Sequence, residues 1–254
     1  MKPINIGMSA KTFSIDSDKY AQSRPRYPGS LFEWLAKRSH SNHKAWDCAT
    51  GSGQGAIGLS DFFDKVYATD ISGEQIENAV KNEKIIYSVN SVEHSNFDNN
   101  SFDLIVAAQS LHWFEYSEYW MEVKRVAKPG ALFSAWGYDW AYSTPQVDDL
   151  LIKPFKEILL PFWNKKNAIL WRGYKNEDIH FPFKRIPMPN FEIYEEWPIQ
   201  NLINYFQTWS AFKLADDNAL EQLNGITKNI LNKIEPTQII PIRMPLKSFA
   251  GIIK

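Results

Sequence analysis

Short apolar runs alternate with amphipathic segments along the first half of the chain, which predicts alternating strands and helices. Runs with the length of strands occupy 45–47, 65–70, 84–89, 102–108 and 131–136. Between them, apolar positions recur at helical spacing in 31–35, 56–63, 76–80 and 119–126. The run at 102–108 is almost continuously apolar, as expected for a parallel strand covered on both faces. The pattern therefore favours a doubly wound α/β sheet.

The second half of the chain follows a different pattern. The stretch at about 138–183 is helical and rich in aromatic residues, and we interpret it as a cap inserted into the sheet domain. Two late runs, 187–194 and 239–253, predict strands on either side of a helical stretch at 199–234. With them the sheet becomes mostly parallel, seven-stranded and Rossmann-like. Proline cannot donate to a strand ladder, so the prolines of both late runs favour positions at the sheet edges.

The N-terminal segment 1–29 places prolines among Tyr20, Arg24 and Tyr27, which predicts an extended path that cannot continue a helix. We interpret the segment as a lid whose Tyr20, Arg24 and Tyr27 contact a substrate, with an ordinary surface arm as the alternative. Aromatic residues make up 15% of the chain, including ten Trp, which favours a pocket for a small organic ligand. We see no linker, so 1–254 is interpreted as a single domain.

A glycine-rich turn follows the first predicted strand. Asp47 ends that strand, and Gly51 and Gly53 follow it in a turn where missing Cβ atoms allow a ligand to approach the backbone. Asp70 ends the second strand 19 residues after Gly51, close to the roughly 20-residue offset of a carboxylate that binds a ribose. The turn therefore predicts an adenine-nucleoside site. Gly51-x-Gly53-x-x-Ala56 also satisfies the dinucleotide fingerprint, which keeps an NAD site open.

Composition and charge exclude several classes of function. The chain has 254 residues, a net charge of −1 and scattered Lys and Arg, so we expect no nucleic-acid partner. Its one cysteine, Cys48, allows no intrachain disulfide and no cysteine-rich metal site, and we expect no metal. No apolar run reaches the roughly 18 residues of a membrane helix, so we expect no membrane partner and a cytoplasmic protein. The sequence leaves the oligomeric state open.

Taken together, the motifs resemble those of the class I S-adenosylmethionine-dependent methyltransferases over nearly the whole chain. The motifs that carry this resemblance are Asp47-x-Ala49-x-Gly51-x-Gly53, Asp70, Phe97-Asp98, Ser101-Phe102-Asp103-Leu104 and Arg125-Val126-Ala127-Lys128-Pro129-Gly130. Within the class, the chain is most similar to the methyltransferase type 11 group, which includes trans-aconitate methyltransferases. That closer similarity rests on Tyr20, Arg24-Pro25-x-Tyr27-Pro28, His112-Trp113-Phe114 and Thr208-Trp209-Ser210.

The resemblance implies S-adenosylmethionine as the cofactor and assigns residues to its parts. The implied cofactor-binding residues are Asp47, Ala49, Gly51, Gly53, Asp70, Val92, Glu93 and Gln109. Asp47 and the backbone of 51–53 would hold the amino acid part, Asp70 the ribose and 92–93 the adenine edge. Gln109 would lie in the loop beneath the methionine. Ala49 departs from the family, which commonly has a glycine at this position.

The implied activity is methyl transfer to a small molecule, possibly a carboxylic acid that is methylated on oxygen. Such an in-line displacement needs an aligned nucleophile and an absence of water, and an ionised carboxylate needs no base. His112 follows the fourth predicted strand, where open α/β sheets bind ligands, so we predict that it orients the substrate or acts as a general base, with a structural histidine as the alternative. Trp113 beside it would form part of the substrate-binding wall. The alternatives are an NAD-linked oxidoreductase and a non-catalytic cofactor-binding protein of the same fold.

Overall fold

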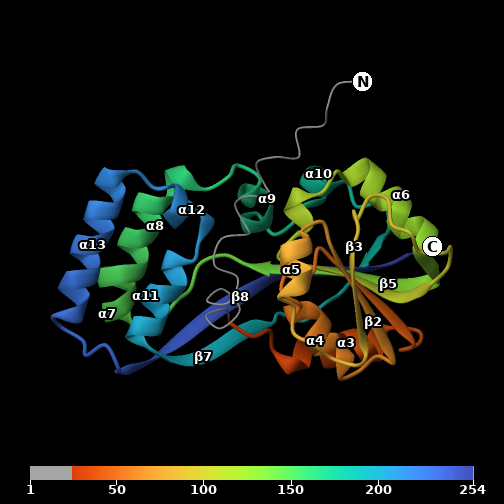
Figure 1. The fold of residues 1–254 in the computed structure, drawn as a ribbon, viewed down its shortest axis with the longest axis horizontal. Helices are drawn as coiled ribbons and strands as arrows, with labels where there is room; N and C mark the ends of the chain where they lie inside the picture. The colour runs from red at the N-terminus through yellow and green to blue at the C-terminus, as the bar shows by residue number, and fades with distance from the viewer. Residues whose placement is uncertain (1–24, 254) are drawn as a thin grey trace.

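The computed structural model describes residues 25–253, which form a sheet lobe and a helical lobe joined by a two-stranded ribbon (Figure 1). In the sheet lobe, strands lie side by side in the order β3-β2-β1-β4-β5-β8-β6. Their bounds are Lys44–Cys48 for β1, Lys65–Asp70 for β2, Ile85–Val89 for β3, Phe102–Ala108 for β4, Ala127–Tyr138 for β5, Lys184–Ile186 for β6 and Ile239–Ile252 for β8. The predicted seven-stranded, mostly parallel sheet is confirmed.

The first five strands form the parallel part of the sheet, and helices cover both of its faces. These helices are α3 (Gly29–Arg38), α4 (Gln54–Ser60), α5 (Gly73–Glu77) and α6 (Tyr116–Val126). Strand β4 lies in the middle of the sheet, and every side chain from Phe102 to Ala107 is buried. A strand buried on both faces reads as a continuous apolar run because water reaches neither face. The parallel arrangement brings the carboxyl ends of β1, β2 and β4 to one edge of the sheet.

Strand β8 corrects the expectation that both late strands lie at sheet edges. It is antiparallel to β5 and lies between β5 and β6. Only its second half, 246–252, enters the seven-stranded sheet. Its first half pairs with β7 (Glu192–Pro198) in the ribbon that joins the lobes, and Pro241 and Pro245 both lie there. The prolines are therefore kept out of the ladder in which their missing N–H groups would cost most.

The helical lobe is built from two separate parts of the chain. The first part contains α7 (Pro145–Val147), a π-helical turn (Asp148–Ile152) and α8 (Lys153–Leu159). The second part, predicted as one helical stretch, divides into α11 (Ile199–Gln207), α12 (Ser210–Leu214) and α13 (Asp217–Leu231). Figure 1 shows these helices side by side, with α13 against α8. The chain of the expected cap also contains α9 (Asn167–Trp171) and α10 (Asn176–Ile179), and α9 packs on β5 of the sheet lobe.

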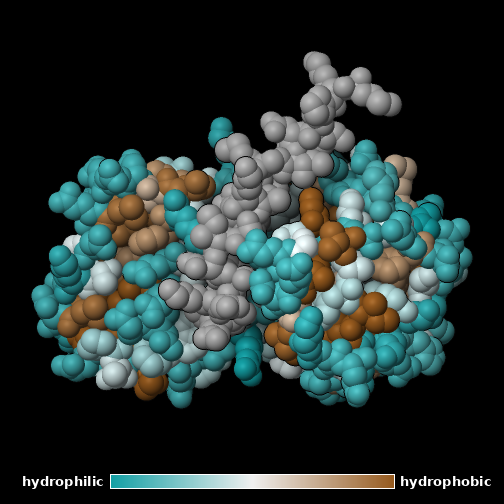
Figure 2. All heavy atoms as spheres, viewed as in Figure 1, coloured by the Kyte–Doolittle hydropathy of each residue, from teal (hydrophilic) through white to brown (hydrophobic). Residues whose placement is uncertain are grey.

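On the face shown in Figure 2, hydrophilic residues predominate and apolar groups lie on both lobes. Four exposed apolar side chains, Ile71, Val80, Ile86 and Val89, lie on or beside the edge strand β3. Within residues 25–253, no helix has the length and apolar character needed to cross a membrane.

Candidate functional site

Two cavities adjoin at the carboxyl ends of the parallel strands. The larger has a volume of about 270 Å³ and is lined by the loop after β1, the end of β2, the loop after β3 and the end of β4. We call it the loop cavity. Its lining includes six of the residues singled out in the sequence for a cofactor, namely Ala49, Gly51, Asp70, Val92, Glu93 and Gln109. Asp47 and Gly53 lie outside this lining, one layer behind the wall.

The loop after β1 turns through left-handed backbone at alternate residues. The φ angles of Ala49, Gly51 and Gly53 are 52°, 57° and 88°. Glycine adopts such φ angles without steric cost. Ala49 adopts its φ at a steric cost, because it carries a Cβ methyl group. The chain then enters α4 directly, so the loop is a tight strand-to-helix turn of the kind that the glycine spacing predicted.

Asp47 is completely buried at the end of β1 and holds this turn from behind. Its Oδ2 accepts a hydrogen bond of 2.6 Å from the Thr50 hydroxyl. Its Oδ1 has no hydrogen-bond partner among residues 25–253. Burial raises the pKa of Asp47 to about 7, although the hydrogen bond from Thr50 and the nearby backbone N–H of Ala56 oppose the rise. A buried acceptor is thus left unsatisfied directly under the loop cavity.

Asp70 links the end of β2 to the same loop. Its Oδ2 accepts from the Gly51 N–H at 2.9 Å, and its Oδ1 accepts from the Ser72 N–H at 2.9 Å. Burial raises its pKa, and these two backbone hydrogen bonds oppose the rise. Each carboxylate oxygen accepts more than one hydrogen bond, so Asp70 keeps acceptor capacity at the cavity wall. The 19-residue spacing read from the sequence therefore corresponds to a direct contact.

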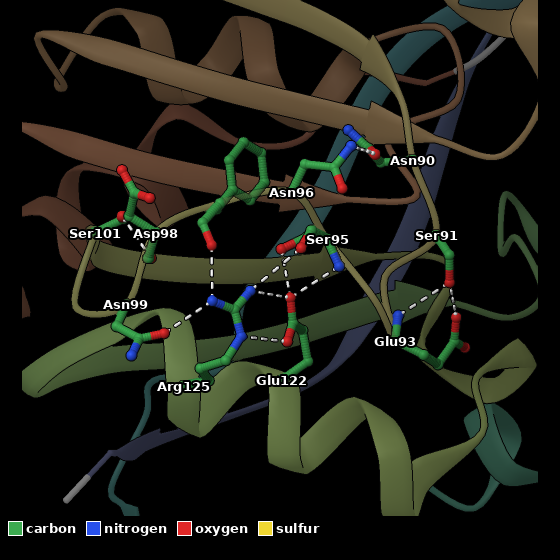
Figure 3. A network of polar contacts seen from close by, with 11 residues as sticks. Asn90, Ser91, Glu93, Ser95, Asn96, Asp98, Asn99, Ser101, Glu122 and Arg125 are labelled. Atoms are coloured by element: carbon green, nitrogen blue, oxygen red, sulfur yellow. Dashed lines mark hydrogen bonds and ion pairs between the residues drawn. The ribbon is translucent and has the colours of Figure 1, made fainter.

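A polar network fixes the loop between β3 and β4, which carries Val92 and Glu93 (Figure 3). Arg125 on α6 donates to the Phe97 carbonyl at 2.7 Å and to Asn99 Oδ1 at 2.9 Å. It also forms two hydrogen bonds, of 2.7 and 2.8 Å, with Glu122 one helical turn before it.

Glu122 completes this network from the same helix. Its Oε1 accepts from the backbone N–H of Ser95 at 2.8 Å and from the Ser95 hydroxyl. Burial acts to raise the pKa of Glu122, but hydrogen bonds from Arg125 and Ser95 outweigh it, and the pKa lies below its ordinary value. Helix α6 therefore positions a loop of the cavity wall without lining the cavity itself.

Glu93 is further constrained by its own neighbours. The Ser91 hydroxyl donates to one of its carboxylate oxygens, and the Glu115 N–H donates to the other at 3.3 Å. Val92 beside it is buried and presents an apolar surface to the loop cavity. This part of the wall therefore combines an apolar contact with a fixed carboxylate.

Gln109 forms the partition between the two cavities. Its φ angle is 56°, and its side-chain amide pairs with the backbone of Tyr138 at the end of β5. Nε2 donates to the Tyr138 carbonyl at 3.0 Å, and Oε1 accepts from the Tyr138 N–H at 2.8 Å. The side-chain amide thus makes the two hydrogen bonds to Tyr138 that the backbone of a neighbouring strand would otherwise make. Gln109 and Trp113 line both cavities.

The smaller cavity, of about 90 Å³, lies between the lobes and is rich in indole rings; we call it the indole cavity. Its aromatic lining residues are Trp113, Tyr138, Trp140, Trp163, Trp171, Tyr205 and Trp209. The Trp140 ring packs edge-on against Trp163 and Trp209, at centroid distances of 6.0 and 5.2 Å. The polar lining residues are Gln109, His112, Asp139, Asn167, Thr208, Ser210 and Lys213. The sequence pattern indicated an aromatic pocket but not which residues form it, because they come from separate parts of the chain.

His112 lies in the short 3-10 helix Leu111–Trp113, directly after β4, and only 3% of it is exposed. Its Nδ1 lies 3.4 Å from the hydroxyl of Tyr174, which the sequence had not singled out. Burial, together with the positive charge of Lys166, lowers the pKa of His112 to about 3. The imidazole is therefore neutral at physiological pH.

The residues predicted for substrate binding are not all in one place. Trp113 lies between the two cavities, and its ring is 4.9 Å from that of His112. Tyr27 lines the loop cavity and packs edge-on against Trp136 at 5.6 Å. Tyr20 and Arg24 lie outside the described residues. Some polar residues near the predicted motifs also line the loop cavity and were not predicted from the sequence. They are Thr50, Ser52, Gln54, Ser72 and Gln75.

Comparisons with known proteins identify relatives of this architecture. The profile of the family described as "Methyltransferase domain" matches residues 46–135. A solved structure from Anaeromyxobacter dehalogenans, provisionally described as a type II methyltransferase, is 33% identical with a TM-score of 0.83, covering 91% of this chain and 98% of that one. A protein of Dictyostelium discoideum, provisionally named a methyltransferase, is 27% identical over 79% of this chain and 77% of its own. A Saccharomyces cerevisiae protein, provisionally named an S-adenosylmethionine-dependent methyltransferase, is 24% identical over 49% of this chain and 46% of its own.

Proposed function

The chain belongs to the class I S-adenosylmethionine-dependent methyltransferases, and on this premise we propose that the indole cavity binds a small-molecule acceptor and that the acceptor is a carboxylic acid. The carrying observation is that the two cavities adjoin and share Gln109 and Trp113 as a common wall. A cofactor in the loop cavity and an acceptor in the indole cavity would meet at that wall. The matched proteins are methyltransferases, so the NAD-linked alternative is not favoured.

The residues around the loop cavity fit S-adenosylmethionine, the cofactor of the family. A Cβ added to Gly51 would meet only Gln75 Oε1, at 3.8 Å, so the space beside this glycine is open to a ligand. The unsatisfied Oδ1 of Asp47 suits a ligand's ammonium group, reached through water or a small shift of the turn. The volume of about 270 Å³ is just below the range of about 300–1,000 Å³ for small-molecule sites.

Each predicted cofactor residue has a role that its position supports. Asp70 would accept the ribose hydroxyls through its remaining lone pairs. Val92 would pack on the adenine ring, and Glu93 would accept from its edge. The backbone around Ala49 and Gly51 would hold the amino acid part, with Gln109 next to the methionine end.

When bound, S-adenosylmethionine supplies an electrophilic methyl group on a sulfonium sulfur. This chain's own residues must then align the acceptor and exclude water. The indole rings of Trp113 and the helical lobe provide the water-excluding surface. Neutral His112 in the same wall orients the acceptor through its ring N–H.

The low pKa of His112 favours an acceptor that is already ionised. A general base works best when its pKa lies near the operating pH, and a base with a pKa of about 3 is far below it. A carboxylate needs no base. Lys213 in the cavity wall would supply a positive charge for it. The wall also holds Asp139, but its Oδ1 accepts from the Trp140 N–H at 2.7 Å and its Oδ2 lies 4.0 Å from Lys247 Nζ.

The experiment that tests this function has two stages. Calorimetry with S-adenosylmethionine, its demethylated product and NAD should show binding of the first two only. Methyl-labelled cofactor is then incubated with a panel of small carboxylic acids, and with alcohols and amines of matched shape, and esters are identified by their lability to base. Labelling confined to alcohols or amines would contradict the carboxylate proposal, and tight cofactor binding without any labelled product would favour the non-catalytic alternative.

A further inference from the structure

Tyr174 is held in a strained and fully buried position between α9 and α10. It is 0% exposed, and its φ of 53° is left-handed, a backbone conformation that is strained for a residue with a side chain. Arg185 donates to the Tyr174 carbonyl at 2.6 Å, and its guanidinium lies 4.2 Å from the centre of the Phe249 ring. Surrounding contacts therefore fix the residue despite the strain.

The hydroxyl of Tyr174 has one hydrogen-bond partner within residues 25–253, which is Nδ1 of His112 at 3.4 Å. The two rings are nearly parallel, with an interplanar angle of 29°. Burial raises the pKa of Tyr174, so the hydroxyl keeps its proton. A buried hydroxyl proton without an acceptor is costly, and Nδ1 is the acceptor that the structure provides. A Tyr174 hydroxyl that donates to Nδ1 has its proton satisfied, and Nδ1 then carries no proton.

We infer that Tyr174 is a positioning residue that fixes the neutral His112 in the tautomer with its proton on Nε2. His112 lines the indole cavity and Tyr174 does not, so an acceptor in that cavity would meet His112 and not Tyr174. The imidazole then offers the acceptor an N–H donor and has no free lone pair with which to remove a proton. This inference rests on the proposed function, because it concerns the acceptor in that same cavity.

The first test reads the tautomer directly, in the protein without any ligand. Long-range ¹H–¹⁵N correlation spectra distinguish a protonated from an unprotonated ring nitrogen, and the His112 signals are assigned by their loss in His112→Asn. We expect an unprotonated Nδ1 in the natural protein and a mixture of both tautomers in Tyr174→Phe. Tyr116→Phe is the matched control, because it removes another buried hydroxyl, one without a partner among the described residues, and should leave the His112 signals unchanged. A proton on Nδ1, or an unchanged spectrum in Tyr174→Phe, would overturn the inference.

The second test uses the reaction. Tyr174→Phe should lower kcat/KM for the acceptor about tenfold while the cofactor Kd stays the same, since Tyr174 does not line the loop cavity. Gln places its amide N–H near the position of Nε2, whereas Asn places it near Nδ1, so His112→Gln should keep more activity than His112→Asn. The reverse order would count against an Nε2 donor. Failure to find any acceptor would contradict the proposed function and leave the tautomer measurement decisive for the inference.

Discussion

The glycines of the loop after β1 are needed for different physical reasons. Gly51 lies at a left-handed φ beside the open space of the loop cavity. A Cβ on Gly53 would collide with the Tyr87 hydroxyl, and one on Gly55 would lie 2.8 Å from Asp47 Oδ2. The sequence predicted the turn and attributed its glycines to ligand contact. For Gly53, the described structure shows a contact with the protein itself, whereas Gly55 lies against Asp47 and also lines the loop cavity.

Ala49 is the position where this chain departs from the glycine of its family, and we expect Ala49→Gly to stabilise the protein. The left-handed φ of 52° roughly costs 1–2 kcal/mol with a Cβ, and the added freedom of glycine when unfolded offsets about 0.5–1 kcal/mol of the relief. The net gain, up to about 1.5 kcal/mol by this reckoning, is measured by urea denaturation. Ala56→Gly in helix α4 is the control and should destabilise. Equal destabilisation by both substitutions would show that Ala49 is not strained.

Asp47 makes the stability of the cofactor-free protein depend on pH. Its folded pKa of about 7 is above the ordinary 3.8, so between these values the native state holds a proton that the unfolded state has released. The contribution of Asp47 to the free energy of unfolding is therefore fully present below pH 3.8 and is lost as pH rises through 7. Asp47→Asn should match the natural protein near pH 4 and exceed it at pH 8, by up to about 4 kcal/mol at 1.36 kcal/mol per pKa unit. Urea denaturation across this range checks it, and an advantage that does not grow with pH would be the contrary result.

At the scale of elements, the pattern of apolar residues predicted the first five strands and the helices between them. Buried parallel strands are easy to predict because they read as continuous apolar runs. The same pattern predicted the positions of the last strands less accurately. Strand β8 serves the ribbon with one half and the sheet with the other, and a local pattern does not show such a division. Likewise the contact between His112 and Tyr174 joins residues 62 positions apart, and Tyr174 belongs to no recognisable motif.

The network of α6 with the loop before β4 leads to a prediction about this element. Arg125→Met removes the hydrogen bonds to the Phe97 carbonyl and Asn99, so cofactor binding must then supply the free energy that orders the loop carrying Val92 and Glu93. We expect the cofactor Kd to rise about tenfold, equivalent to about 1.4 kcal/mol, as measured by calorimetry.

Arg243→Met is the matched control for that substitution. Arg243 also makes two hydrogen bonds to one glutamate, Glu192, but in the ribbon that joins the lobes. Its removal should leave the cofactor Kd unchanged. A similar loss of affinity in both variants would mean that the loop network has no special role.

At the scale of the whole molecule, the two cavities differ in which lobe builds them. The lining of the loop cavity comes from the sheet lobe alone. The indole cavity takes His112 and Trp113 from the sheet lobe and Tyr205, Trp209 and Lys213 from α11, α12 and the turn between them. Family motifs mark the sheet lobe, and six of the residues predicted for the cofactor lie in the lining of the loop cavity. The helical lobe forms its part of the cavity wall from segments that are distant in the sequence. The residues that would bind the acceptor were therefore not predictable from the sequence.

A substitution of Lys213 tests two points together: whether the helical lobe contributes to the acceptor site but not to the cofactor site, and whether the acceptor is an anion. If the acceptor is a carboxylate, Lys213→Met removes a charge-assisted interaction on the scale of about 1.5–3 kcal/mol, and kcat/KM for the acceptor should fall by about 10-fold to 100-fold. The cofactor Kd should not change, because Lys213 does not line the loop cavity. Lys156→Met is the control: Lys156 lies 5.3 Å from the centre of the Trp140 ring in the same lobe but does not line the indole cavity. Steady-state kinetics and calorimetry on both variants separate the outcomes. An unchanged kcat/KM in Lys213→Met would contradict an anionic acceptor beside α12. A higher cofactor Kd would show that the helical lobe also affects the cofactor site.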